Sequence, residues 1–391
     1  MEQTFAVATL WTGLALVSTF LARHMKISLA LMEIVVGMVA AAIMVFVFGA
    51  DAMGADLPWV KFIASAGAVA LTFLAGAELD PAALRVKWKE VSFVGLAGFL
   101  APFLGCAAIA RYALGWSAQA SLLAVVALST TSMAVVYAVM LEFGFNKTEF
   151  GKGVLGACFV NDLGTVIALG LLFAPFTART FIFIGVCVAV FIALPFATGR
   201  LIALYGNRTA AVRTKWILFI LFGLGALSLW AGSEAVLPAY IAGIVLAGSV
   251  GRDDAYIRRL RTLTIGFLTP FYFLRAGSFV SLPALAAAPL IFFILLAGKV
   301  FSKISGLFHL IGVFRKNKKE QWYYTLLMST GLTFGTISAL YGYTNGIISR
   351  EQYSYLVAVV IGSAVIPTLI ANAVFMPRHL LAQPRGETKG A

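Results

Sequence analysis

The chain has 391 residues, of which 61% are hydrophobic and 12% are charged. A soluble domain does not need that balance, and apolar runs of about 20 residues, each long enough to cross a bilayer, recur from end to end. The sequence therefore predicts an all-α polytopic membrane protein. The first run follows Glu2 and has neither a basic n-region nor a clear cleavage site, so we interpret it as a retained span.

The apolar runs predict about thirteen transmembrane helices. Their expected bounds are 4–22, 28–50, 58–79, 90–110, 118–141, 149–173, 180–199, 216–233, 236–250, 262–281, 284–307, 321–343 and 352–376.

The net charge of +13 is distributed unevenly over the loops that these spans predict. Loops on one side, with the C-terminal tail and the adjoining helix ends, hold 23 of the 29 Lys and Arg residues, and the other side holds four. This is the positive-inside pattern, which predicts a cytoplasmic C-terminus and an external N-terminus. We expect an integral protein of the cell membrane, such as a bacterial inner membrane, and binding to the lipid bilayer but not to nucleic acid.

Two pairs of similar segments lie 200 residues apart. LTFLAGAEL from Leu71 resembles FYFLRAGSF from Phe271, and LSTTSMAVVY from Leu128 resembles MSTGLTFGT from Met328. The offset equals seven spans, an odd number, so the two copies would have opposite orientations in the membrane. The sequence thus predicts two inverted repeats, spans 1–6 and 8–13, joined by span 7.

Hydroxyl side chains cluster near the centres of the fifth and twelfth spans. Ser and Thr bond preceding carbonyl groups, so one cluster alone only bends a helix. Paired clusters in inverted halves predict two discontinuous helices, whose ends can hold an ion. The candidate residues are Ser129, Thr130, Thr131 and Ser132 in one cluster and Ser329, Thr330, Gly331, Thr333, Gly335 and Thr336 in the other.

Asp162 lies in VNDLGT, residues 160–165, about halfway along the sixth span. A charge there costs on the order of 3 kcal/mol or more, so an intramembrane acid suggests a functional site. A carboxylate can hold a proton or a partly dehydrated monovalent cation, but not both, which is the physical basis of exchange. The alternative is a structural acid paired with another helix. Asn161 can offer a carbonyl oxygen to an ion, or form a helix-packing hydrogen bond.

Other charged residues lie within or at the ends of spans. Lys299, near the centre of the eleventh span, predicts a charge near the ion site, with snorkelling as the alternative. Lys303, one turn nearer the edge, should snorkel easily. Arg275 is a fixed countercharge that we expect to snorkel or to pair with an acid. Glu33 and Glu78 line a cytoplasmic approach or lie at the interface.

No set of residues predicts a cofactor or an enzyme. Three cysteines fall within spans without metal-ligand spacing, and three histidines lie in or beside predicted loops, so an intramembrane protease or acyltransferase has no candidate residues at the midplane. The cysteines are Cys106, Cys158 and Cys187, and the histidines are His24, His309 and His379.

Nearly the whole chain resembles the monovalent cation:proton antiporters of the Kef-type and NapA-like branch, although the nucleotide-binding domain common in Kef-type members is not expected. The order of the motifs carries the resemblance: ALMEIVVGMV, FLAGAELDPAALR, LSTTSMAVV, VNDLGT, YIAGIVLAG, PFYFLRAGS and LLAGKV. It implies an NhaA/NapA-like fold and a homodimer. In this fold a core domain with two crossing broken helices moves against a dimerisation domain. The implied division is dimerisation domain 1–89 and 205–283, core domain 90–175 and 284–377, linker 176–204, and cytoplasmic tail 378–391.

The resemblance implies antiport of Na⁺ or K⁺ against H⁺, with Asp162 as the shared carboxylate, Thr130 and Thr131 at the break beside it, and Lys299 as the core lysine. Many electrogenic members have a second acid where this chain has Asn161, so we expect electroneutral exchange of one cation for one proton. A proton-independent cation conductance and a sensor without transport remain alternatives.

Overall fold

The computed structural model describes residues 2–25, 29–48, 53–77, 87–145, 148–173, 177–205, 211–233, 235–251 and 253–380. Regular secondary structure in these ranges is entirely helical. The α-helices are α1 (Glu2–Met25), α2 (Leu29–Phe48), α3 (Pro58–Ala77), α5 (Trp88–Ala108), α6 (Ala118–Ser129), α7 (Met133–Glu142), α8 (Glu149–Phe173), α9 (Ala178–Tyr205), α10 (Val212–Trp230), α11 (Val236–Leu246), α12 (Asp254–Leu263), α13 (Thr269–Ser278), α14 (Leu282–Ala287), α15 (Pro289–Phe314), α16 (Lys318–Met328), α17 (Thr333–Thr344) and α18 (Arg350–Ile370). Short π-helical segments are η1 (Ile109–Ala113), η3 (Thr264–Leu268) and η4 (Ala371–Phe375), and η5 (Arg378–Leu380) is a 3₁₀ turn.

The helical pattern confirms a polytopic membrane protein. Within the described ranges, nine helices are long and apolar enough to cross a membrane. They coincide with nine of the predicted spans. The other four predicted spans are helical too, but each is short or divided: α6 with α7, α11 alone, α12 with η3 and α13, and α16 with α17. The total of thirteen crossings stays a prediction.

Two of the divided spans are broken where the hydroxyl clusters lie. Thr130 is extended (φ −64°, ψ 154°) between α6 and α7, and residues 329–332 separate α16 from α17. The hydroxyl groups bond nearby carbonyls of their own chain: Thr330 Oγ1 donates to Leu327 O at 2.8 Å, and Ser329 Oγ donates to Thr325 O at 2.8 Å. Such local bonds offer the backbone an alternative to continuing the helix.

The two breaks lie against each other. Thr131 Oγ1 donates to Met328 O at 2.9 Å, and the backbone N–H of Ser132 donates to Thr330 Oγ1 at 3.3 Å. These bonds join segments that are 197 and 198 residues apart in the chain. The close meeting of the breaks agrees with crossing discontinuous helices, while the inverted repeat itself stays a prediction.

Small residues allow other helices to approach closely. A Cβ atom at Gly37 of α2 would overlap the backbone of Leu274 in α13, and one at Gly277 would overlap the carbonyl of Ile34. Without a hydrophobic driving force between helices in lipid, such close backbone packing is a main source of association. The pair α2 and α13 therefore forms a tightly fixed unit.

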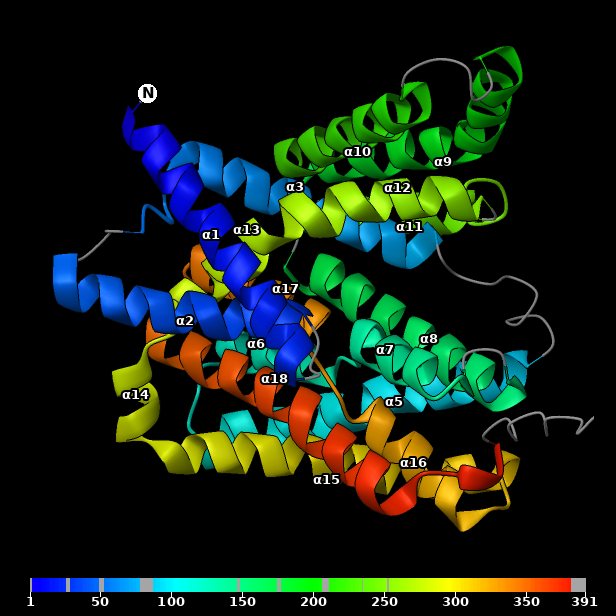
Figure 1. Cartoon of the computed structure of the whole chain (residues 1–391). Coiled ribbons are helices and arrows are strands. Elements are labelled where there is room, and N and C mark those ends of the chain that lie inside the picture. Colours follow the sequence, from blue (N-terminus) through cyan, green and yellow to red (C-terminus); the bar gives the residue numbers. More distant parts are fainter. Residues whose placement is uncertain are drawn as a thin grey trace, which may run out of the picture.

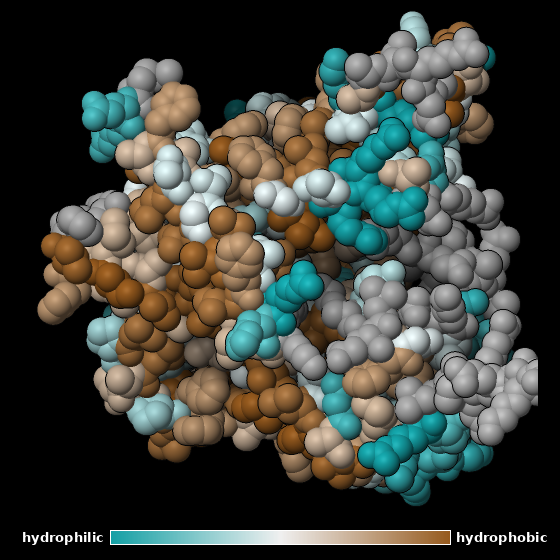
Figure 2. Space-filling view, viewed as in Figure 1, coloured by the Kyte–Doolittle hydropathy of each residue, from teal (hydrophilic) through white to brown (hydrophobic). Residues whose placement is uncertain are grey.

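Figure 1 shows α9, α10, α11 and α12 in the upper part of the molecule and α5, α15, α16 and α18 in the lower part, with α6, α8 and α17 between them. In Figure 2 apolar residues cover much of the visible face, and hydrophilic residues gather in separate patches on the right and at the upper edge. Many large apolar side chains are exposed, for example Phe46, Phe196 and Phe301. Lipid contact explains this exposure in a membrane protein.

In the part of the chain that the structure describes, buried apolar side chains form three large clusters. The shared cluster contains residues of α2, α13, α6, α8, α17 and α18, and so joins the upper and lower helices. The upper cluster is drawn from α3, α9, α10, α11 and α12, and the lower cluster from α5, α7, α8, α15 and α16. Helix α8 contributes Phe150 and Cys158 to the lower cluster, and Phe159 and Leu169 to the shared one.

Candidate functional site

Asp162 lies in the middle of α8, an unbroken helix of 25 residues. Its side chain is buried, with 1% of the residue exposed, and Oδ1 has no hydrogen-bond partner among the described residues. The carboxyl group is near the backbone N–H of Thr131 and within electrostatic range of Lys303 and, more weakly, Lys299. Helix α8 thus places Asp162 beside the first break.

Lys303 contradicts the prediction that it would snorkel to the edge. Its side chain is fully buried, and Nζ donates to Thr131 Oγ1 at 3.0 Å. The prediction was wrong because the helix was expected to end at residue 307. Helix α15 instead continues to Phe314, so residue 303 lies near its middle. Lys303 therefore leaves the group of basic residues counted at the membrane surface.

Lys299 lies one turn earlier on α15 and faces the second break. It is fully buried, and its Nζ has no hydrogen-bond partner among the described residues. The ammonium lies so close to Gly331 that a Cβ at that position would overlap it, while Thr130 Oγ1 and Ser363 Oγ are 3.0 and 3.4 Å from the same point. The two lysines therefore contact Thr131 and Gly331, residues that are 200 positions apart in the chain.

The hydroxyl groups of the two breaks have different orientations. Ser129 Oγ donates to Val125 O within its own helix, and Thr130 Oγ1 donates to Ala127 O at 3.3 Å. Thr131 points across to the other break, as described above. Thr333 begins α17 and is 9% exposed. Of the hydroxyls on the first break, Thr131 is thus the one that links Lys303 with α16.

Asn161 is fully buried beside Asp162, and neither Oδ1 nor Nδ2 has a hydrogen-bond partner among the described residues. Its amide nitrogen faces α5, 3.3 Å from the point where a Cβ on Gly98 would lie. An unpaired buried amide is costly, so this pair of atoms is available to a ligand or a water molecule.

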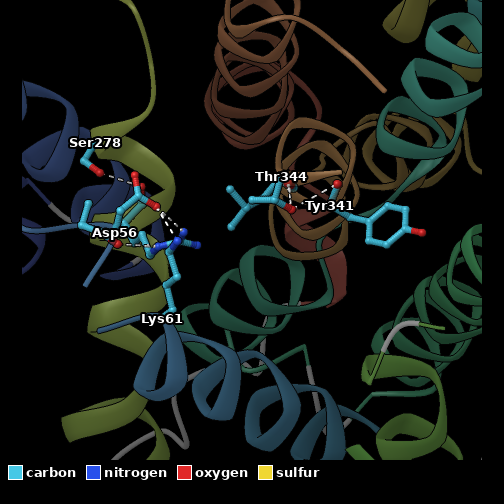
Figure 3. A network of polar contacts seen from close by, with 8 residues as sticks. Asp56, Lys61, Ser278, Tyr341 and Thr344 are labelled. Carbon is cyan, nitrogen blue, oxygen red and sulfur yellow. Dashed lines mark hydrogen bonds and ion pairs between the residues drawn. The ribbon is translucent and has the colours of Figure 1, made fainter. Parts of the chain in front are cut away.

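Arg275 lies apart from these residues, at the end of α13. Its Nη2 pairs with Asp56 Oδ1 at 3.3 Å, and its Nε donates to Ala55 O at 2.8 Å. Figure 3 shows Asp56 beside Lys61, with Ser278 nearby. Partial burial acts to raise the pKa of Asp56, but Lys61 and Arg275 outweigh it and hold that pKa below its usual value.

Two predicted acids are not brought to the breaks by any described contact. Glu33 is buried in α2, which packs against α1 and α13, and its Oε1 has no partner among the described residues. Glu78 lies outside the described residues. The structure therefore supports no role at the breaks for Glu33 or Glu78.

Four helix ends meet at the two breaks and contribute partial charges to the site. The carbonyl ends of α6 and α16 carry partial negative charge, and the amide ends of α7 and α17 carry partial positive charge. Together with Asp162 they surround the two buried amino groups of Lys299 and Lys303. The arrangement provides carboxylate, carbonyl and hydroxyl oxygens, which are the ligands that hard monovalent cations prefer.

Lys303 is a residue of the site that sequence reasoning missed. Its spacing of four from Lys299 places both lysines on one face of a helix, which is a signal that the sequence does contain. Two buried lysines facing crossed, broken helices and a mid-membrane acid define a membrane transporter of the broken-helix type.

The family described as "Sodium/hydrogen exchanger, transmembrane" matches residues 12–376. The chain therefore belongs to the sodium/hydrogen exchanger family, whose members are monovalent cation:proton antiporters. A probable Na⁺/H⁺ antiporter 3 of Methanocaldococcus jannaschii is 25% identical over 86% of this chain and 89% of its own length. A Na⁺/H⁺ antiporter of Enterococcus hirae is 25% identical over 78% of this chain and 82% of its own.

A glutathione-regulated potassium-efflux protein of Escherichia coli, KefC, is 26% identical over 72% of this chain but only 47% of its own length. Among solved structures, the sodium proton antiporter MjNhaP1 of Methanocaldococcus jannaschii matches with a TM-score of 0.70 and 17% identity, covering 97% of this chain and 99% of that one. This likeness confirms the fold that the sequence predicted.

Proposed function

We propose that the protein exchanges Na⁺ or K⁺ for H⁺ by secondary active antiport, with Asp162 binding the two ions in turn. The observation that carries this proposal is the buried position of Asp162 beside the meeting point of two broken helices. A carboxylate without a full set of partners needs either a proton or a cation there. The names of the relatives, which include Na⁺/H⁺ antiporters and a potassium-efflux protein, agree with this choice of ions.

The exchange ratio that we propose is one cation for one proton. Asn161 cannot titrate, so Asp162 is the single carboxylate of the pair on α8. For this ratio to hold, neither Lys303 nor Lys299 gains or loses a proton during the cycle. A lysine that also lost its proton during the cycle would make transport electrogenic, and measuring the charge moved per cation distinguishes the two ratios.

We propose alternating access, in which a core domain of α5–α8 and α15–α18 moves against α1–α3 and α10–α13. Ion pairing supports a rigid core: Arg315, at the end of α15, binds Glu90 of α5 through two bonds of 2.9 and 3.1 Å. The separate upper and lower clusters support a boundary between the domains along one half of α8.

Contacts at the predicted outer end suggest which conformation this is. Tyr353 of α18 donates to Ala276 O of α13 at 2.6 Å, and the rings of Tyr343 and Phe279 lie 5.5 Å apart. The shared cluster also joins the domains at this end. We infer a conformation in which the two domains are in contact at this end and separated at the face with the basic loops. We propose that this face is cytoplasmic. A homodimer in the cell membrane completes the proposal.

The test uses purified protein in liposomes with a pH-sensitive dye inside, to which Na⁺, K⁺ and Li⁺ are added separately. Wild-type protein should move protons in response to at least one cation, and Asp162→Asn should abolish the response because an amide neither titrates nor carries charge. Asp253→Asn makes the same chemical change in the loop before α12 and should retain transport. Wild-type rates in Asp162→Asn would refute the carrier role, and cation flux without proton movement would indicate a conductance instead.

A further inference from the structure

Tyr240 lies in α11 and is fully buried. Its helix is fixed to α3, because two glycines let the backbones touch. A Cβ at Gly243 would overlap the carbonyl oxygen of Phe73, and one at Gly76 would overlap that of Tyr240 itself. Since close packing of this kind leaves no room for sliding, Tyr240 belongs with α3 in the proposed dimerisation domain.

The side chain of Tyr240 reaches across to two helices of the proposed core. Its hydroxyl donates to Phe159 O of α8 at 3.3 Å, and the two ring centroids are 5.5 Å apart. The same ring meets Phe334 of α17 edge-on at 5.6 Å. One side chain of one domain therefore contacts both the unbroken and the broken helix of the other.

These contacts lie next to the ion site along both core helices. Phe159 precedes Asp162 by about one turn of α8, and Phe334 is the second residue of α17 after the break. Tyr240 is also within electrostatic range of Asp162. Any displacement of α8 and α17 relative to α3 and α11 must separate the hydroxyl from its carbonyl partner, because a hydrogen bond weakens steeply beyond its normal geometry.

We propose that Tyr240 is a positioning residue for transport, whose bond to Phe159 holds the two domains in this conformation and breaks each time the core moves. This inference rests on the proposed function, since it requires a moving core. A contact made in one conformation and lost in the other shifts the populations of the two. The apparent affinity for the cation on each face depends on those populations.

Tyr240→Phe tests this proposal, because it keeps the ring and removes the hydroxyl. A buried hydrogen bond shifts a two-state equilibrium by roughly two- to tenfold. We expect the KM for Na⁺ to rise on the face that is open in this conformation and to fall on the opposite face, so that their ratio changes by roughly two- to tenfold. The measurement is Na⁺-driven proton flux in liposomes of known protein orientation, with Na⁺ added to one face at a time.

Tyr324→Phe is the matched control. Tyr324 is also fully buried and donates its hydroxyl to a carbonyl of the same helix α8, Gly153 O at 3.0 Å, but it belongs to α16 and so to the same domain. Its loss should lower thermal stability to a similar extent while leaving the ratio of the two KM values as in the wild type.

The proposal is overturned if Tyr240→Phe leaves the KM ratio unchanged, or if Tyr324→Phe changes it equally. Melting temperatures of both variants show that each is folded. If the wild-type protein exchanges ions and Tyr240→Phe has no effect on the KM ratio, this inference alone is refuted. If the wild-type protein does not exchange ions at all, the proposed function is refuted.

Discussion

Thr131 connects the two parts of the site through one hydroxyl group. Its Oγ1 accepts from Lys303 Nζ and donates to Met328 O. Thr131→Val keeps the size of the side chain but leaves the ammonium and the carbonyl without these bonds. Unpaired buried groups cost about 1–3 kcal/mol, so thermal stability should fall and transport should slow. Thr131→Ser keeps the hydroxyl and should retain both. Equal melting temperatures for the Val and Ser variants would contradict this role.

At the scale of the element, the second break depends on the missing side chain of Gly331. A methyl group there would overlap the ammonium of Lys299, so Gly331→Ala should displace that lysine and reduce the rate of transport at least tenfold, as small misplacements in a site do. Gly223→Ala is the control, because a Cβ at this position of α10 meets nothing within 4 Å. It should be neutral or slightly stabilising, since Ala favours helix. Normal transport by Gly331→Ala would show that Lys299 is dispensable there.

The same elements show what could be predicted from sequence. The hydroxyl clusters predicted both breaks, because Ser and Thr side chains bond carbonyl groups only three or four residues away in the chain. The burial of Lys303 was not predictable in that way, since it depends on where α15 ends, and helix ends are the least reliable part of such a prediction. Tyr240 was also missed: its partner Phe159 is 81 residues away in the chain, and only tertiary packing joins them.

At the scale of the whole molecule, the orientation of the chain can be tested with two introduced cysteines. Lys316, between α15 and α16, and Asn345, between α17 and α18, are both exposed and should lie on opposite faces of the membrane. The native cysteines are buried and would be replaced by alanine. An impermeant maleimide should label Asn345→Cys in intact cells and Lys316→Cys only after the membrane is opened. Labelling of both in intact cells would contradict the predicted topology.

The hydrogen bonds between the two breaks also bear on how tightly transport is coupled. Thr131 is bonded to Met328 and Ser132 to Thr330, so neither broken helix can shift by itself without losing hydrogen-bond partners among buried residues. A lone shift of one half-helix is the kind of local opening through which protons would run down their gradient unaccompanied. Because these hydrogen bonds join the two broken helices, such a leak costs free energy. Joint movement of the two helices keeps the bonds and therefore costs less.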